Sequence, residues 1–550
     1  MIRKKAWSSM DDFFNSEDYL DIIIPNLELP ETIEPPEEKR IIDDELGVFY
    51  YKRDNQAPLT DQSYPYVVIP RCLGLLGIKD VQAAGIPQVR QTLGLTGKGV
   101  LVGLVDTGID KSASFLRDEF GKTKLMAIWD QTKGTDAYDE ILSGGGVEGN
   151  SRYVSEEGYG NDENGHGTYL ASLVDQVAPE GSFVVVKLRE AKRYLREYYY
   201  IPEQEPAYQE NHIMEGIAFC QSVAREKGMP LALCMALGSN NGSHSGSGTL
   251  SEYLNKVAGI WGQVVVVATG NEAGKRHHFF GRTSGQRNGI QEGPVEVEIN
   301  VERDMTGFYL ETWAGAPDLY YLEIISPSGK SYSTNYYRSD TRHQYYYPLE
   351  GTTVTIDYRS VGRNRGDQLI FVRFDRAKAG IWRILVYPGN VYGGTFHMWL
   401  PMEGMLESDV YFLEANPQVT LTMPSAAQTP ISVGAYEVDN NAIFINSGRG
   451  YTAEGRVKPD FVASGVNVLG TWLEGGPYQY TGTSPAAAIT TGAAALVLQW
   501  GVVLQNRKYL NSSNVGNFLI QGCKRDLGRT YPNDLWGYGV LDLFQSFLES

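Results

Sequence analysis

The chain has 550 residues, and its 42% hydrophobic and 21% charged residues are typical of a globular protein with more than one domain. It carries 66 acidic and 48 basic side chains, which give a formal net charge of −18. Such a surface repels nucleic acid and anionic membranes, so neither is expected as a partner.

The cysteines and the first residues of the chain argue against a metal-binding or secreted protein. The four cysteines, at positions 72, 220, 234 and 523, have no metal-type spacing, which predicts reduced, buried thiols and no metal centre. The opening MIRKKAWSSMDDFF has no apolar run between its basic and acidic residues, unlike a secretory signal peptide. No apolar stretch is evident that is long enough to span a bilayer. We therefore expect synthesis in the cytoplasm.

The first 80 residues form a region of mixed pattern. A Pro/Glu-rich segment, LELPETIEPPEEKR, is followed by the strand-like runs GVFYYKR and YPYVVIP. These runs predict a small α+β unit over residues 1–80, ahead of the first long buried strand.

Residues 81–288 have the pattern of an α/β domain. An apolar run over residues 100–105 ends in Asp106, as expected of a buried parallel strand. GSFVVVKL, PLALCMALG and GQVVVVATGNEAG repeat this form, and helical patterns such as IMEGIAFCQSVAREKG lie between them. The alternation predicts a doubly wound parallel sheet with helices on both faces, whose functional residues gather at the carboxyl ends of the strands.

The pattern changes over residues 289–418. VEVEINVE alternates apolar and polar residues, and YYLEIISPSGK, QLIFVRF and IWRILVYPG follow between turns, which predicts an antiparallel β sandwich or jelly roll. The α/β pattern resumes over residues 419–550, so we interpret the β segment as an insertion in one α/β domain; the alternative is a linker domain between two unrelated domains. The tyrosines of HQYYYP could belong to a carbohydrate-binding platform, but a hydrophobic sheet face is favoured.

The stretch YTGTSPAAAITTGAAALVLQW places Ser484 where a turn enters an apolar helix. A serine there is either a helix cap or a nucleophile. A nucleophile needs a base and a group that orients the base. His166 in NDENGHGTYLAS and Asp106 at the strand end are the candidates, because histidine accepts the proton of a serine and a buried carboxylate fixes its tautomer.

Asn271 follows Gly270 at the end of the most apolar strand, in VVVVATGNEAG. A Gly-Asn-Glu turn is an ordinary way to end a strand. The asparagine amide could instead donate a hydrogen bond to a developing oxyanion, and the backbone N–H of Ser484 could supply a second donor.

These stretches resemble the subtilisin-like serine proteases. VDTGID, GHGT, GNE, KPDFVASGV and GTS occur in the family order, TGAAAL continues the helix after the serine, and WGYGVLD resembles the family's C-terminal end. The resemblance implies that Asp106 orients, His166 is general base and acid, Ser484 is nucleophile and Asn271 binds the oxyanion. It also implies that Leu237 and Gly238 in CMALGSN pair with an extended peptide, beside Gly270. No cofactor is implied, and acidic loops such as YGNDEN are read as solvated turns rather than calcium sites.

One departure concerns the helix after the serine. The family reads Gly-Thr-Ser-Met-Ala-x-Pro, whereas this chain has Pro485 after the serine and Ala488 where the family has proline. Proline is compatible with the first turn of a helix, where its missing N–H has no partner to lose. Because this departure lies next to the nucleophile, one alternative is a pseudoprotease that only binds and signals.

The domain order resembles the Csp germination proteases of spore-forming Clostridia, and the complete triad resembles their catalytic, CspB-type members. That resemblance implies a pro-region that is cut once between about residues 65 and 80 and stays in the groove as an inhibitor. It also implies a spore-associated protein whose substrate is the pro-form of a spore-cortex hydrolase. A general intracellular subtilase is the other alternative.

Overall fold

The computed structural model describes residues 10–25, 36–43, 45–52, 68–75, 82–142, 146–283, 286–287, 290–291, 293–334, 341–361 and 366–549. Its centre is an eight-stranded sheet in the order β26-β25-β11-β9-β5-β7-β6, with β27 also paired to β25. All pairs are parallel except β25 with β26. The strands are β5 (Leu101–Asp106), β6 (Leu125–Asp130), β7 (Ser182–Lys187), β9 (Leu231–Met235), β11 (Gln263–Ala268), β25 (Ile431–Glu437), β26 (Ala442–Ile443) and β27 (Phe461–Ser464).

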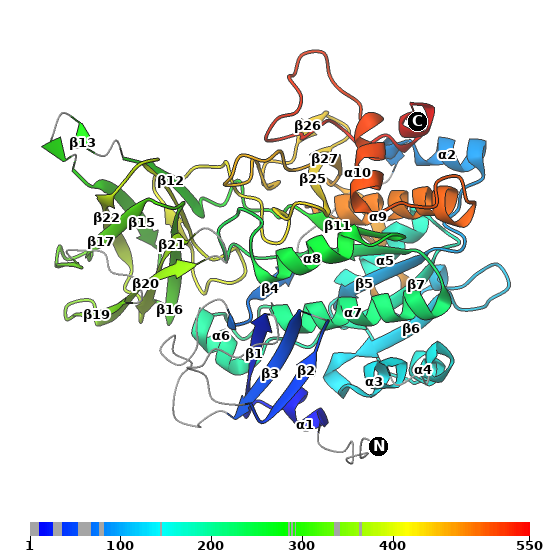
Figure 1. The fold of residues 1–550 in the computed structure, drawn as a ribbon, viewed down its shortest axis with the longest axis horizontal. Coiled ribbons are helices and arrows are strands. Elements are labelled where there is room, and N and C mark those ends of the chain that lie inside the picture. The colour runs from blue at the N-terminus through cyan, green and yellow to red at the C-terminus, as the bar shows by residue number, and fades with distance from the viewer. Residues whose placement is uncertain are drawn as a thin grey trace.

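Helices cover both faces of this sheet, with α7 and α8 over one face and α5 and α9 over the other (Figure 1). The inner strands are nearly continuous runs of valine, leucine and alanine because they are buried on both sides. The predicted doubly wound fold is confirmed. The helices are α2 (Ile86–Leu93), α3 (Asp136–Leu142), α4 (Gly146–Ser155), α5 (His166–Val177), α6 (Arg193–Tyr199), α7 (Glu210–Lys227), α8 (Thr249–Gly259), α9 (Ser484–Leu498), α10 (Ser512–Gln521) and α11 (Leu543–Leu548).

The helix that starts at Ser484 is unusually apolar. With the π-helical turn Gln499–Val503 it is long and apolar enough to cross a membrane by length and composition, which corrects the sequence-based statement that no such stretch exists. However, 83% of its most apolar window is buried inside the protein. Its apolar character is therefore explained by packing against the central sheet.

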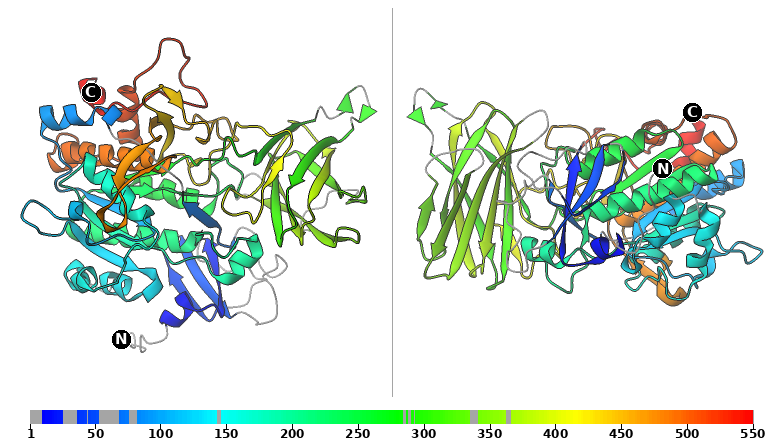
Figure 2. Two further views of the ribbon diagram at one scale, coloured as in Figure 1. Left: turned by 180° about the vertical axis from the view of Figure 1, so that it is seen from behind. Right: turned by 60° about the horizontal axis from the view of Figure 1, so that its bottom comes forward.

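The inserted segment forms two antiparallel sheets packed face to face around their own core (Figure 2). Phe308, Tyr320 and Trp382 lie at the centre of this core. One sheet has the order β12-β23-β16-β21-β20-β19 and the other β18-β17-β22-β15-β24. The strands are β12 (His278–Arg282), β15 (Val295–Val301), β16 (Gly307–Ala314), β17 (Leu319–Ile325), β18 (Ser331–Ser333), β19 (Thr341–Tyr347), β20 (Thr352–Val361), β21 (Asp367–Asp375), β22 (Gly380–Asn390), β23 (Thr395–Trp399) and β24 (Val410–Phe412), beside the small hairpin β13 (Gln286–Arg287) and β14 (Ile290–Gln291).

Strand β16 is buried on both faces. Phe308 and Leu310 point into the sandwich, whereas Tyr309 and Trp313 belong to the core of the α/β domain. The sandwich is therefore joined to the α/β domain by an apolar contact as well as by two chain crossings. Of the tyrosines in HQYYYP, Tyr347 is fully buried and Tyr345 stacks on Tyr332, as expected of a sheet face.

The N-terminal region contributes helix α1 (Met10–Asn15) and a three-stranded antiparallel sheet in the order β1-β3-β2. This sheet lies against the α/β domain (Figures 1 and 2), and its apolar residues share that domain's core. A separate strand, β4, follows further along the chain. The strands are β1 (Tyr19–Pro25), β2 (Glu38–Ile41), β3 (Leu46–Lys52) and β4 (Cys72–Leu75).

Candidate active site

Asp106 is the last residue of β5, at the carboxyl edge of the central sheet. Strand β5 lies between β7 and β9, so the chain winds outward from β5 in both directions and leaves a crevice at this edge. The Asp106 side chain is buried, and its Oδ1 accepts the N–H of Thr107 at 2.8 Å. That bond holds the carboxylate in one orientation at the crevice.

His166 is the first residue of α5 and is completely buried. The preceding Gly165 has φ 99°, and a β-carbon there would lie 2.1 Å from the ring of Trp472, so only glycine fits. Asp162 accepts the N–H groups of Gly165 and Thr168 at 2.7 and 2.9 Å. The acidic loop before the histidine thus binds a free N–H of the first turn of α5, which helps to hold the start of the helix in place.

Ser484 is the first residue of α9 and is also buried. Its Oγ lies 3.3 Å from Nε2 of His166, while Nδ1 of the same ring lies 2.8 Å from Oδ1 of Asp106. The hydroxyl therefore faces a base, and it is Thr483 that occupies the cap position of the helix. Asp106 binds Nδ1 and so orients the imidazole with Nε2 toward the serine proton, which is the arrangement of a nucleophilic triad.

Pro485 fits this arrangement. It lies within the first turn of α9, where a missing N–H costs no helical hydrogen bond. The helix still begins at the serine, and the Ser484 hydroxyl still reaches the histidine. Ala488, at the family's proline position, is fully buried in the same helix. The departure from the family pattern thus leaves the nucleophile in place.

Asn271 lies beside the nucleophile through contacts with the residue before it. Its Oδ1 accepts the N–H of Thr483 at 3.1 Å, and the Thr483 hydroxyl accepts the N–H of Gly270 at 3.0 Å. Because Oδ1 is occupied, the Nδ2 group of Asn271 is the end of the amide left to serve an oxyanion. The Ser484 N–H, at the start of α9, has no helical acceptor and can serve the same oxygen.

Replacing Asn271 by alanine is expected to reduce turnover about 10²–10³-fold while KM changes little, because the lost hydrogen bond forms only with the transition state. The range is the one known for losing one oxyanion donor in subtilisin itself. Steady-state kinetics on a peptide substrate measure it. An unchanged kcat would show that Asn271 only ends a strand.

The predicted substrate edge is already paired with a segment of the chain itself. Strand β10 (Leu237–Gly238) pairs antiparallel with β4, with Leu237 opposite Leu75 and Gly238 opposite Gly74. On the other side, β4 pairs with β8 (Tyr208–Gln209). An extended peptide thus lies between two edge strands. Strand β8 could not be predicted from the sequence, because a two-residue strand in PAYQENH has no periodicity.

The chain is similar in sequence and structure to known proteins. The model of the subtilase family, Peptidase S8, matches residues 97–293 and 396–539. The CspB protease of Clostridium perfringens has a similar structure, with a TM-score of 0.72 and 28% sequence identity, over 85% of this chain and 97% of that one.

Shorter similarities extend to eukaryotic proteases. The membrane-bound transcription factor site-1 protease of Mus musculus is 32% identical over 134 residues, 23% of this chain and 12% of that protein. The subtilisin-like protease SBT6.1 of Arabidopsis thaliana is 28% identical over 133 residues, 23% of this chain and 13% of that protein. The chain thus matches only about an eighth of the length of these relatives.

Proposed function

The chain belongs to the subtilase family, with Asp106, His166 and Ser484 as its catalytic triad, and from this premise we propose that it is a serine endopeptidase that first cuts its own N-terminal region and then a protein substrate. The observation that carries the proposal is β4. A segment of the chain lies antiparallel on the substrate edge, where a peptide substrate of such an enzyme would lie.

The geometry defines each step of peptide hydrolysis. His166 Nε2 takes the proton of Ser484 as Oγ attacks the scissile carbonyl carbon, and the oxyanion forms between Asn271 Nδ2 and the Ser484 N–H. The imidazolium, stabilised by Asp106, then protonates the leaving amine, which departs and leaves an acyl-enzyme. Water repeats the sequence, releases the new carboxyl group and returns the proton to Ser484.

The N-terminal region has the position of a pro-region. Strand β4 lies on the substrate edge and ends at Leu75, so we place the scissile bond of a self-cleavage after Leu75. Of the range of about 65 to 80 predicted from the sequence, this keeps the part after residue 75; residues 65–67 and 76–80 of that range lie outside the described residues. A pro-region that folds against the α/β domain also helps a sheet with many non-local strand pairs to form.

Wild-type protein is therefore expected to run as two fragments on a denaturing gel and to elute as one particle from a sizing column. Ser484→Ala is expected to run as a single full-length chain. N-terminal sequencing of the larger fragment locates the new start, expected between about residues 76 and 81. An intact start at Met1 in active wild-type enzyme, or the same cut in the Ser484→Ala variant, would contradict self-processing.

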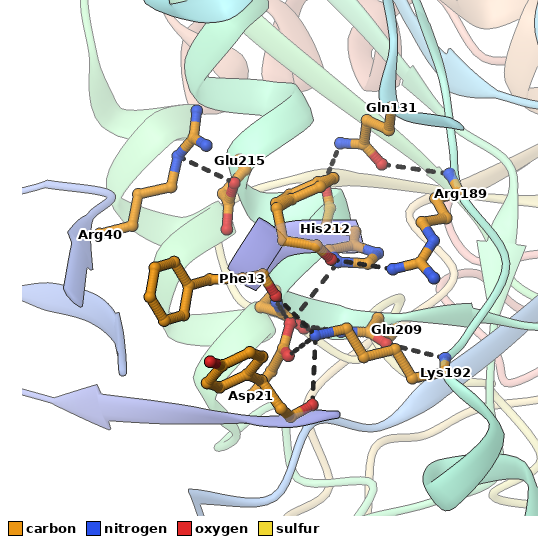
Figure 3. Close-up of polar contacts among 12 residues, drawn as sticks. Phe13, Asp21, Arg40, Gln131, Arg189, Lys192, Gln209, His212 and Glu215 are labelled. Atoms are coloured by element: carbon orange, nitrogen blue, oxygen red, sulfur yellow. Dashed lines mark hydrogen bonds and ion pairs between the residues drawn. The ribbon is translucent and has the colours of Figure 1, made fainter. Parts of the chain in front are cut away.

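A buried polar cluster supports a pro-region that stays bound after cleavage (Figure 3). Asp21 of β1 forms a completely buried ion pair with Lys192 of the α/β domain, and its Oδ2 accepts hydrogen bonds from Gln209 and Asn211, both at 2.9 Å. A second buried pair joins Arg40 of β2 to Glu215 of α7 at 3.1 Å. Dissociation would have to break both ion pairs and the hydrogen bonds of Asp21 together.

The likeness to CspB over nearly all of that chain suggests the biological role. We propose that the protein is spore-associated and that its substrate is the pro-form of a spore-cortex hydrolase, cut during germination. Incubating the purified enzyme with such a pro-form tests this role, because the proposal requires shortening by wild type and none by Ser484→Ala. A pro-form that stays intact with active enzyme would leave a general intracellular protease as the function.

A further inference from the structure

Arg71 lies immediately before β4, and its backbone continues the path of that strand. Its carbonyl accepts the N–H of Glu210 at 2.7 Å, and its own N–H donates to the Glu210 carboxylate at 3.3 Å. The side chain extends over a glycine-rich loop. A β-carbon would lie 3.3 Å from its Nη1 at Gly242 and only 2.8 Å at Gly248. The guanidinium therefore lies against bare backbone at both glycines.

The same loop contacts the inserted sandwich through Glu311 of β16, a completely buried residue. Its Oε1 accepts a hydrogen bond from the Asn241 amide at 3.0 Å, and its Oε2 accepts from the Gly242 N–H at 2.8 Å and from the Trp313 indole at 2.7 Å. These donors are neutral. They satisfy the lone pairs of the carboxylate, but a buried negative charge is stabilised fully only by a nearby cation.

Gly242 lies close to both charged groups, since its N–H donates to Glu311 and a β-carbon on it would lie 3.3 Å from Nη1 of Arg71. The two charges also act on the same neighbour. Burial, and then the negative charge of Glu311, raise the pKa of the Tyr309 phenol, whereas Arg71 acts in the opposite direction. The arginine of the N-terminal region and the glutamate of the sandwich therefore belong to one site.

We propose that Glu311, with the loop at Gly242 and Gly248, forms a substrate subsite that selects an arginine. In β4 the residue paired with Gly238 is Gly74, and Arg71 precedes it by three positions. The selected arginine of a substrate would likewise lie three positions before the substrate residue that pairs with Gly238. The inference rests on the proposed function, in which β4 marks the path of the substrate. It assigns the sandwich a direct part in specificity, because the charged group that selects the arginine comes from the inserted domain.

A competition assay tests the selection. Two peptides copied from residues 66–83, one with arginine and one with methionine at position 71, are cleaved in one tube by the processed enzyme. Any pro-region still bound then lowers both rates equally. Wild type is expected to prefer the arginine peptide about tenfold in kcat/KM, since a hydrogen-bonded charge contributes more than a neutral contact. Glu311→Gln is expected to bring the ratio close to one, while the exposed Glu302→Gln of the same sandwich keeps it.

A purely structural role of Glu311 would slow cleavage of both peptides and leave their ratio unchanged. That outcome, or a wild-type ratio near one, overturns the subsite.

A second measurement needs no catalysis. In the uncleavable Ser484→Ala chain, Arg71→Met and Glu311→Gln are each expected to lower Tm. The variant with both substitutions is expected to lower Tm by clearly less than the sum of the two single losses. Additive losses overturn the pairing. If neither peptide is cut by wild type but the two substitutions are coupled, the protease function fails and the pairing stands.

Discussion

Ser484→Ala is expected to abolish labelling by a fluorophosphonate probe and to lower peptide hydrolysis about 10⁶-fold. The probe reacts only with a serine whose proton is taken by a base, and Ser484 Oγ lies 3.3 Å from the His166 ring. The size of the loss is the one known for the nucleophile of subtilisin itself, and the activity that remains comes from the oxyanion donors and substrate binding. Gel fluorescence and steady-state kinetics measure the two effects.

The matched control is Ser513→Ala, which removes an exposed serine in the first turn of α10. It is expected to label like wild type, because Ser513 contacts neither His166 nor the substrate edge. Equal labelling of Ser484→Ala and wild type would contradict the assignment of the nucleophile. Loss of labelling in both variants would point to misfolding, which the elution volume on a sizing column reveals.

The central sheet could be predicted from the sequence because its inner strands are buried on both faces. Runs such as VVVVA have no room for polar residues, so burial leaves a visible mark. Strand β6 was missed, since LMAIWD mixes residue types and has no valine run. Strand β12, HFFGR in the sequence, was not predicted either, because its residues do not alternate between apolar and polar and it lies before the alternating pattern that signals the sandwich.

The triad residues could be proposed for a similar reason. Each stands in a short motif at the end of a strand or the start of a helix. The contacts that hold the site are different, because they join positions far apart in the chain. Nothing in TGTS predicts that the Thr483 hydroxyl accepts the N–H of Gly270, or that Trp472 closes against Gly165. Lys192 and Asp21 are separated by 171 positions, and neither has a local pattern that names the other.

Asp21→Asn is expected to weaken binding of the cleaved pro-region roughly 10²–10⁴-fold, the second largest effect. Asp21 and Lys192 have no solvent-exposed side-chain surface. The amide keeps the shape of the carboxylate but removes its charge, which leaves the Lys192 ammonium buried without its counter-charge. Breaking a buried pair in this way costs about 3–5 kcal/mol, which sets the expected range. Retention of the small fragment during dilution and sizing chromatography measures the loss.

Two further variants separate charge from shape. The double change Asp21→Leu with Lys192→Met removes both charges and is expected to recover most of the affinity, because a buried ion pair is often replaceable by apolar groups. Glu17→Gln breaks the Glu17–Arg189 pair across the same interface, but Glu17 is half exposed, so an effect below about tenfold is expected. If Asp21→Asn binds as tightly as wild type, the buried pair does not hold the pro-region.

The same cluster sets how binding depends on pH. Burial alone would raise the pKa of Asp21, but Lys192 and the hydrogen bonds lower it to about 2, so its contribution is complete above the ordinary value of 3.8 and is lost as pH falls through about 2. Burial lowers the pKa of His212 from 6.5 to about 4, so its contribution is complete above 6.5 and declines as pH falls toward 4. Both groups therefore favour dissociation in acid.

Glu215 has the opposite sign, because burial raises its pKa from 4.5 to about 7 against the pull of Arg40. Its contribution is complete below 4.5 and is lost as pH rises through 7. Between pH 4.5 and 6.5 the slopes of His212 and Glu215 oppose each other, so affinity should change little there. Below 4.5 only the losses at His212 and Asp21 remain, so a sizing column should retain less of the small fragment at about pH 3 than at pH 6. Tighter binding in acid would show that the Arg40–Glu215 pair, rather than Asp21, governs retention.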